Sequence, residues 1–245
     1  MKIAVIYKWA RDPEAASVRA DGSIDWRGAK MMAGEDDPAA LDAAKTIAEG
    51  SVAQIIGITI GDGDASWILA RGVNETLSVI DAPSLSDQAI TGEILASAVN
   101  KLGDIDVVAI GDPHSYSGVP VTLAGTLGWP ALMGLTTAKT EEGKIIATKK
   151  NGNEEKQITI STPVVLGFVA ESEEKKVPGM KEKLMARKRP ITKITISDLG
   201  LSSIKDRINI DSSRVPEEKQ AHLFEGEPSN AVGQLVETLR KEGVL

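Results

Sequence analysis

Residues 111–118 form a glycine- and hydroxyl-rich segment whose composition suits binding of a phosphate group. It follows an apolar run and leads into an expected helix that begins near Val119. Free backbone N–H groups and the positive end of the helix dipole attract phosphate at such a junction. The loop reads Gly111, Asp112, Pro113, His114, Ser115, Tyr116, Ser117 and Gly118. This pattern predicts an anion-binding loop, although taken alone it is not specific.

Several other chemistries are excluded by residue type. The chain has no cysteine, which rules out disulfides, thiolate metal ligands, cysteine nucleophiles and iron–sulfur clusters. Its two histidines, His114 and His222, are too few for a histidine metal cluster, so we expect no metal site. No serine or carboxylate can be assigned as a partner of His114 from the sequence. We therefore interpret His114 as a loop residue that forms hydrogen bonds and not as an acid–base group. We therefore expect no catalytic residue.

Familiar nucleotide and calcium motifs are also missing. Neither GxxxxGKS/T nor a GxGxxG that opens a helix after the first strand occurs, so the phosphate-loop and dinucleotide fingerprints are absent. Residues 61–64 begin like a calcium loop but lack the later ligands and the closing glutamate. We interpret them as a strand-to-helix turn with Asp64 as the cap.

Alternating apolar runs and amphipathic stretches fill the first half of the chain. Short continuous apolar runs are typical of buried parallel strands, and acidic or hydroxyl caps mark the helix starts. The runs are residues 3–7, 55–60, 76–80 and 105–110, and the stretches are 39–48 and 87–102, the latter after Ser86. This alternation predicts an α/β fold with a doubly wound, mostly parallel sheet.

A doubly wound sheet binds ligands beyond the carboxyl ends of its strands, where the strand order reverses. The predicted site therefore combines four segments that follow expected strands or lead into helices. They are the segment after Tyr7, the turn Gly34, Glu35, Asp36 and Asp37, the turn after Ile60, and the loop 111–118.

The pattern changes in the second half of the chain. Turn signals bracket two short alternating segments, residues 144–148 and 157–161, which we expect to form an antiparallel addition, and residues 163–169 supply one more buried strand. We expect an α/β domain over 1–189 that includes a charged segment, 171–189. From Pro190 apolar residues become sparse, so residues 190–245 are predicted to form an arm that rests on a partner. Its one expected helix covers 230–242, after the cap Ser229.

Composition limits the partners. The 245 residues are 42% hydrophobic and 26% charged, as in globular proteins with a sizeable core. A net charge of −7 and a pI near 5.1 argue against nucleic acid as the main partner. No apolar stretch is long enough for a signal peptide or a membrane span, and we expect a cytoplasmic protein.

Five segments resemble the electron-transfer flavoprotein beta-subunit family in order and spacing. Residues 5–12 are similar to its first strand with the following lysine and aspartate, 20–25 to its short hairpin, and 128–130 to a later turn. The most specific match is residues 178–190, which resemble its recognition loop and basic cluster, followed by Asp-Leu-Gly at 198–200. The hairpin is most similar to the branch linked to carnitine and nitrogen-fixation (Fix) pathways.

The resemblance implies a Rossmann-like, adenine-nucleotide-binding subunit that is an electron carrier and no enzyme. It would form a heterodimer with an alpha subunit that holds FAD, and would bind AMP, or a second FAD in electron-bifurcating members. Electrons would come from an acyl-CoA or similar dehydrogenase, anchored at Met180 with Lys181 and Leu184 beside it. The implied nucleotide contacts are Ile6, Gly34 to Asp37, Ile60, and Gly111 to Val119.

Departures from the family pattern leave alternatives open. The loop is a few residues shorter than is usual in the family, and residues 115–118 replace consecutive acidic or amide residues, so the nucleotide is AMP, FAD or none. Lys149 and Lys150 stand where an arginine–glutamate pair is common, and Pro13 where some members have an aromatic residue beside the flavin. The alternative is a stand-alone adenine-nucleotide-binding protein of the universal-stress type, whose Gly-x-x-Gly phosphate motif the stretch 111–125 lacks.

Overall fold

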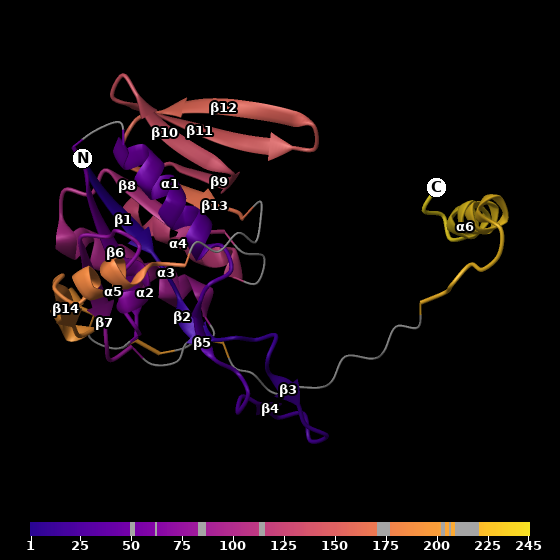
Figure 1. The fold of residues 1–245 in the computed structure, drawn as a ribbon, viewed down its shortest axis with the longest axis horizontal. Coiled ribbons are helices and arrows are strands. Elements are labelled where there is room, and N and C mark those ends of the chain that lie inside the picture. Colours follow the sequence, from indigo (N-terminus) through magenta and orange to yellow (C-terminus); the bar gives the residue numbers. More distant parts are fainter. Residues whose placement is uncertain are drawn as a thin grey trace. The chain divides into compact units, whose positions relative to one another are not determined.

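The computed structural model describes residues 1–49, 52–61, 63–82, 87–112, 116–170, 177–201, 204–205, 207–208 and 221–245 (Figure 1). Internal contacts divide the chain into two compact units. The α/β unit comprises residues 1–17 and 25–211, and the C-terminal unit comprises residues 18–24 and 212–245. The main sheet and every segment of the predicted site belong to the α/β unit.

The α/β unit is built on a sheet in which seven strands from the described residues run parallel, in the order β14-β7-β6-β1-β8-β13-β9. From β1 the chain adds β6 and β7 on one side, and later β8 and β13 on the other, so the predicted doubly wound fold is confirmed. The strands are β1 (Lys2–Ile6), β6 (Gln54–Ile60), β7 (Glu75–Val79), β8 (Val107–Gly111), β9 (Ala131–Leu135), β13 (Val164–Phe168) and β14 (Ile191–Ile194).

Helices cover both faces of this sheet. On one face, α1, α2 and α5 share a hydrophobic core with β1, β6, β8 and β13. On the other face, α3 and α4 pack against the alternate side chains of the same strands. The helices are α1 (Asp37–Glu49), α2 (Ser66–Leu69), α3 (Gln88–Leu102), α4 (Gly118–Leu127), α5 (Met180–Ala186) and the 3-10 turn η2 (Ser197–Leu199).

Local sequence explains where these elements begin and end. The Asp87 carboxylate accepts a hydrogen bond from the Ala89 N–H at 2.8 Å and so caps α3, whereas Ser86 lies outside the described residues. Gly128 adopts a left-handed conformation, with φ of 68°, and ends α4. Asp64, predicted as the cap of α2, lies one residue before the N-cap Ala65, and its Oδ1 accepts the Ser66 N–H at 2.9 Å. All five residues of β8 are buried, as its continuous apolar run predicts.

A three-stranded antiparallel sheet, in the order β10-β11-β12, is added to the α/β unit beside α1 (Figure 1). On its inner face, Ala138, Ile145 and Ala147 are buried in the core that α1 shares. Lys149 on β11 and Lys156 on β12 are opposite each other in the ladder, and both residues are exposed. The predicted antiparallel addition is confirmed, and β10 is a third strand that the alternation pattern missed. The remaining strands are β2 (Trp9–Arg11), β3 (Ser17–Val18), β4 (Ile24–Asp25), β5 (Met31–Ala33), β10 (Thr137–Glu141), β11 (Lys144–Asn151) and β12 (Glu154–Ile160).

The expected arm, residues 190–245, differs from its prediction in two respects. β14 pairs with β7 in the main sheet, so the α/β unit continues past residue 189. The terminal helix α6 (Pro228–Lys241) begins at Pro228 after Glu227, and Ser229 lies inside it, because proline suits the first turn. No helix within the described residues is both long and apolar enough to cross a membrane.

Candidate functional site

The strand order of the main sheet reverses between β1 and β8. Their carboxyl ends therefore form the place where a doubly wound sheet binds ligands. Three segments meet there: residues 6–8 at the end of β1, the turn 34–37 at the start of α1, and residues 111–112 at the end of β8, with Tyr116 beside them. We refer to this group as the switch-point site.

Asp37 ties the first two segments together. Its Oδ2 accepts the Lys8 N–H at 2.7 Å and the Gly34 N–H at 2.8 Å. The side chain begins α1, where a carboxylate is favoured by the helix dipole, yet the residue is only 5% exposed. Burial raises the pKa of Asp37 to about 7, against the opposing effect of those two hydrogen bonds. The site thus contains a carboxyl group whose pKa lies near neutral pH.

Asp36 connects the same turn to the end of β13. Its Oδ1 accepts the Ala170 N–H at 2.7 Å, across 134 residues of sequence. In the sequence, Ala170 directly precedes the charged segment 171–189. The turn that shapes the site is thereby bonded to the root of the segment predicted to dock a partner.

Gly111 lets the turn approach β8. A Cβ atom at residue 111 would lie 3.1 Å from the Asp36 Cβ, 3.2 Å from the Asp36 backbone carbon and 3.2 Å from the Asp37 Oδ1. Contacts this short to backbone atoms require a shift of the main chain. Glycine at this position is therefore explained by packing against the acidic turn.

Tyr116 and Lys8 cover the acidic turn. The Lys8 Nζ lies 4.3 Å from the centre of the Tyr116 ring, which is a cation–π contact. Burial, followed by the charges of Asp37, Asp36 and Glu35, raises the pKa of Tyr116 to about 12. The hydroxyl is accordingly neutral at physiological pH and can donate a hydrogen bond. Lys8 and Tyr116 together offer a cation, an aromatic ring and a hydroxyl donor.

Tyr7 adds a buried hydroxyl on the α2 side of the sheet. Its ring stacks on Trp67 at 5.8 Å between centroids, and its Oη is buried and has no hydrogen-bond partner within the described residues. Desolvation, with the charges of Asp64 and Asp37, raises the pKa of Tyr7 above its usual value. An unsatisfied buried hydroxyl costs about 1–3 kcal/mol, so this group is left at the edge of the site at the expense of stability.

The start of α4 differs from its prediction. The Gly118 N–H, expected to face a phosphate, donates to the Gln88 Oε1 at 2.8 Å. A Cβ on Gly118 would lie 2.7 Å from that oxygen, so glycine fits Gln88 here. Gln88 begins α3 and was missed, because its effect depends on α3 and α4 packing side by side. A ligand would reach this amide only by displacing the Gln88 side chain.

The other predicted residues have distinct places. Ile6 is buried in the core at the end of β1, Val119 is buried at the start of α4, and Ile60 is half-buried at the end of β6. Asp112 turns toward β9, where its Oδ2 accepts the Gly134 N–H at 2.8 Å. Pro113, His114 and Ser115 lie outside the described residues. Among the residues that are described, no cluster of three or more acidic, histidine or cysteine side chains could hold a metal.

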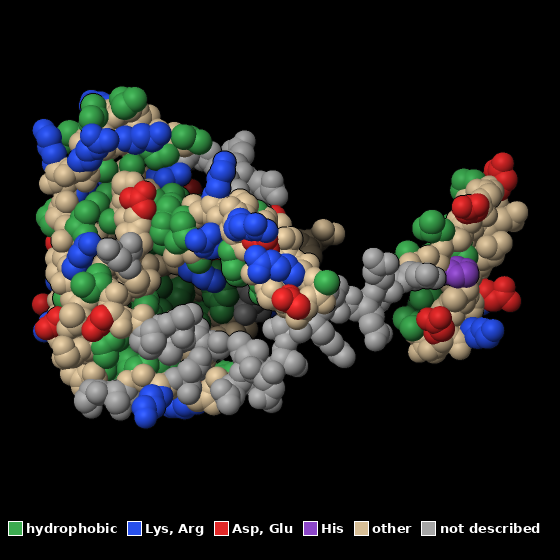
Figure 2. Space-filling model, turned by 90° about the horizontal axis from the view of Figure 1, so that it is seen from below, with side chains coloured by type: hydrophobic (Ala, Val, Ile, Leu, Met, Phe, Trp, Pro, Cys, Tyr) green, Lys and Arg blue, Asp and Glu red, His purple; other side chains and the backbone are tan. Residues whose placement is uncertain are grey.

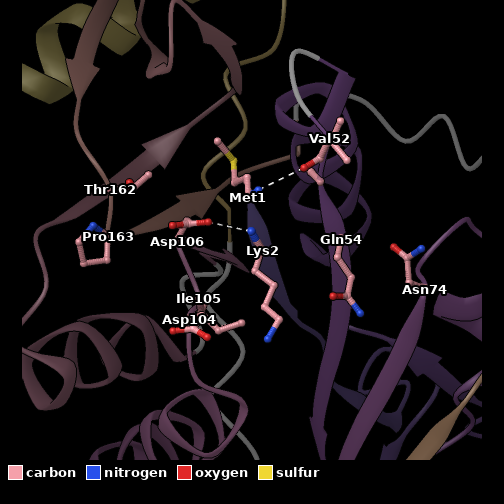
Figure 3. A pocket seen from close by; sticks show the side chains of 11 residues that line it. Met1, Lys2, Val52, Gln54, Asn74, Asp104, Ile105, Asp106, Thr162 and Pro163 are labelled. Atoms are coloured by element: carbon pink, nitrogen blue, oxygen red, sulfur yellow. Dashed lines mark hydrogen bonds between the residues drawn. The ribbon is translucent and has the colours of Figure 1, made fainter.

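A hollow of about 700 Å³ lies at the opposite, amino edge of the sheet (Figure 3). Its polar groups face one another: the Asp106 Oδ2 accepts the Lys2 N–H at 2.8 Å, and the Met1 amino group donates to the Val52 carbonyl at 3.1 Å. These bonds tie the starts of neighbouring strands together. We therefore assign this edge a structural role.

The predicted docking residues lie on α5 and face solvent. Met180 is 74% exposed, Leu184 is 53% exposed, and Lys181 is exposed between them. Arg189 fixes the end of this segment, because its Nη1 donates to the Leu69 carbonyl at 2.7 Å and to the Val73 carbonyl. An apolar surface on a helix that is anchored at its base suits contact with another protein.

Comparison with known protein families identifies the family of this chain. A family model described as the electron transfer flavoprotein domain matches residues 27–199. The matched range covers well over half of the chain, from the residues just before β5 to η2.

Proposed function

Because the chain belongs to the electron transfer flavoprotein domain family, we propose that it is the beta-type subunit of a heterodimeric electron-transfer flavoprotein. The match over residues 27–199 carries this proposal, because it includes most of the main sheet, the acidic turn and α5 together. Family members are electron carriers, and we propose the same role here. The assignment to the carnitine and Fix branch stays a prediction.

We propose that the switch-point site binds an adenine nucleotide, either AMP or the adenosine part of a second FAD. The residues present fit such a group in their chemistry: Lys8 supplies a cation for a phosphate, and Tyr116 supplies an aromatic ring and a neutral hydroxyl. Asp36 and Asp37 are committed to backbone N–H groups and shape the turn. A flavin, when bound, supplies the redox chemistry, and this chain orients it and excludes water.

The main flavin is proposed to be an FAD carried largely by an alpha subunit.

The C-terminal unit supports the presence of a partner subunit, because no residue of α6 is buried. Leu223 is 76% exposed, Val232 58% and Leu235 42%, and hydrophobic side chains of this segment are open to solvent among acidic ones (Figure 2). An amphipathic helix without a core of its own needs a surface to cover. We propose that the arm packs on the alpha subunit.

Dehydrogenases of the acyl-CoA or a similar class are the proposed electron donors, docking transiently at α5. Met180 and Leu184 are four residues apart and therefore lie on one face of the helix. Basic residues follow at 187–189 and would steer an acidic partner. We propose a cytoplasmic location. Nucleic acid and membrane partners are not part of the proposal.

Purification of the tagged chain co-expressed with its genomic neighbours tests this function. The expected result is a one-to-one complex with a second chain, a flavin absorption band, and AMP or a second FAD among the ligands released for mass spectrometry. A colourless, thermally stable monomer that carries ATP would contradict the proposal and favour the universal-stress alternative, which shares the fold.

A further inference from the structure

Glu35 is the one exposed carboxylate of the acidic turn 34–37. Its two acidic neighbours are committed to the fold, because Asp36 is 9% exposed, Asp37 is 5% exposed, and each accepts backbone N–H groups. Glu35 is exposed, and within the described residues it forms no hydrogen bond. Its carboxylate oxygens are therefore available to accept hydrogen bonds from a ligand of the switch-point site.

Gly34 brings Tyr116 close to this turn. A Cβ atom at residue 34 would lie 3.1 Å from the Tyr116 Oη and 2.9 Å from the Asp37 Oδ2, so a side chain there would displace both groups. Glu35 is the next residue along the chain. Burial, followed by the charges of Asp37, Asp36 and Glu35, raises the pKa of Tyr116, which shows that the Glu35 carboxylate acts on this hydroxyl. Glu35 thus belongs to the switch-point site.

Tyr116 lies between a cation and this part of the turn. The Lys8 Nζ is 4.3 Å from the centre of the ring, whereas Gly34, followed by Glu35, lies at the hydroxyl end. In an adenine nucleotide the ribose connects the phosphate to the base. A phosphate bound at Lys8 therefore places the ribose hydroxyl groups on the side of Tyr116 where Glu35 lies.

A carboxylate is an acceptor for these hydroxyl groups. An ionised carboxylate only accepts hydrogen bonds, and a ribose hydroxyl can donate one. Acidic side chains bind ribose hydroxyl groups in this way in other doubly wound nucleotide-binding folds. A negative charge beside a single cation weakens the binding of every anion. Glu35 therefore favours only those anions that donate hydrogen bonds to it.

We propose that Glu35 is a specificity-determining residue of the switch-point site, which accepts hydrogen bonds from the 2′ and 3′ hydroxyl groups of an adenine ribonucleotide. The inference rests on the proposed nucleotide function and identifies the part of the nucleotide that is recognised. AMP and the adenosine part of FAD both carry this free diol. A phosphate on either hydroxyl group removes a donor and adds a negative charge beside Glu35.

This specificity has a consequence for the proposed electron donors. The substrates of acyl-CoA dehydrogenases carry an adenine nucleotide with a phosphate on its 3′ hydroxyl group. Glu35 repels that phosphate, so the switch-point site discriminates against the nucleotide end of coenzyme A. The site can then hold its own nucleotide in the presence of the substrates of a docked dehydrogenase.

Calorimetry on the purified complex, freed of bound nucleotide, tests the role of Glu35. The affinities of AMP, 2′-deoxy-AMP and adenosine 3′,5′-bisphosphate are measured at one pH and one ionic strength. The wild type should bind AMP about tenfold more tightly than 2′-deoxy-AMP, which is the expected size of one hydrogen bond to an accessible carboxylate. The bisphosphate should bind more weakly than either.

Two variants separate the acceptor from the charge. Glu35→Ala removes both, so AMP and 2′-deoxy-AMP should bind with equal affinity. Glu35→Gln keeps an acceptor oxygen and removes only the charge, so it should retain part of the preference for AMP while the bisphosphate binds about tenfold more tightly than in the wild type. Glu49→Gln is the matched control, because Glu49 is an exposed carboxylate at the other end of α1.

The outcomes distinguish this inference from the function on which it rests. If AMP binds but Glu35→Ala keeps the wild-type preference over 2′-deoxy-AMP, the role of Glu35 is overturned and the nucleotide site stands. An equal change in Glu49→Gln would overturn it as well, since the effect would then be one of net charge. If AMP does not bind the wild-type complex, both the nucleotide function and the role of Glu35 fall. Loss of the AMP preference in Glu35→Ala alone supports the proposal.

Discussion

The two edges of the main sheet use similar side chains in different ways. At the amino edge, the Asp106 Oδ2 accepts the Lys2 N–H at 2.8 Å and the Asn74 Oδ1 accepts the Ile55 N–H at 2.8 Å, and both bonds fasten strand starts. At the carboxyl edge, Asp37 makes equivalent bonds but is buried, with a raised pKa, and the Tyr7 hydroxyl has no hydrogen-bond partner among the described residues. Departures from the local rules of stability such as these two at the carboxyl edge are typical of a functional site.

The comparison is tested most strongly by Asp37→Asn. The pKa of Asp37 is about 7 in the folded chain and 3.8 in the reference state, so the folded form binds the proton more tightly. Its contribution to stability is fully present below pH 4 and is lost as the pH rises through about 7. The shift corresponds to about 4 kcal/mol as an upper value.

Chemical unfolding from pH 4 to 8 measures this dependence. The unfolding free energy of the wild type should fall relative to that of Asp37→Asn as the pH rises. Asparagine accepts the same hydrogen bonds without ionising, so the variant lacks this pH dependence. A constant difference across this range would mean that the carboxyl group is not desolvated as the structure indicates.

Gly111→Val addresses the close approach of the acidic turn to β8. A valine would meet Asp36 backbone and Asp37 carboxylate atoms at about 3.2 Å, so we expect a loss of about 1–3 kcal/mol in unfolding free energy together with weaker nucleotide binding. Gly125→Ala in α4 is the control, because its added Cβ meets no atom within 4 Å and should raise stability slightly. Similar melting temperatures for the two variants would refute the packing role of Gly111.

Met180→Ala extends the comparison to a surface that belongs to neither edge. Since Met180 is 74% exposed, its loss should leave the melting temperature unchanged but weaken docking of the dehydrogenase by about 1–3 kcal/mol. Coupled flavin reduction at limiting dehydrogenase concentration measures the effect, with Val121→Ala on α4, where the side chain is 58% exposed, as an apolar surface control. A lower melting temperature with normal coupling would show that Met180 serves packing.

Asp106→Ala gives the smallest expected effect. Removing the acceptor for the Lys2 N–H at the amino edge should cost about 1 kcal/mol of unfolding free energy. Nucleotide affinity should stay at the wild-type value. A clear loss of nucleotide binding in this variant would break the assignment of structural and functional roles to the two edges.

The sequence predicted the elements better than the contacts between them. Continuous apolar runs located β1, β6, β7 and β8 to within two residues, because buried parallel strands require them. β14 was missed because Ile191–Ile194 is short and edge-exposed, so it carries only a weak apolar signal. The turn 34–37 was expected beyond the end of β1, and Asp37 bonds it to Lys8 there; its contact with a nucleotide stays a prediction.

What the sequence could not supply is which polar groups satisfy each other. The sequence predicts that the Gly118 N–H binds phosphate, but in the fold this N–H donates to Gln88 at the start of α3. It also predicts that Asp112 contacts a ligand, but the Asp112 carboxylate accepts the Gly134 N–H on β9. Both pairings join residues far apart in the chain. No pattern local to the loop 111–118 contains that information.

Photo-crosslinking with an azido derivative of AMP tests the central claim, nucleotide binding at the carboxyl edge, most directly. Crosslinked peptides of the purified complex are identified by mass spectrometry, with and without excess AMP. We predict AMP-protected crosslinks in the segments 5–12, 34–37 or 111–119, which contain or adjoin the predicted nucleotide contacts. Protected crosslinks confined to residues 52–54, 104–106 or 162–163 at the amino edge would contradict the account.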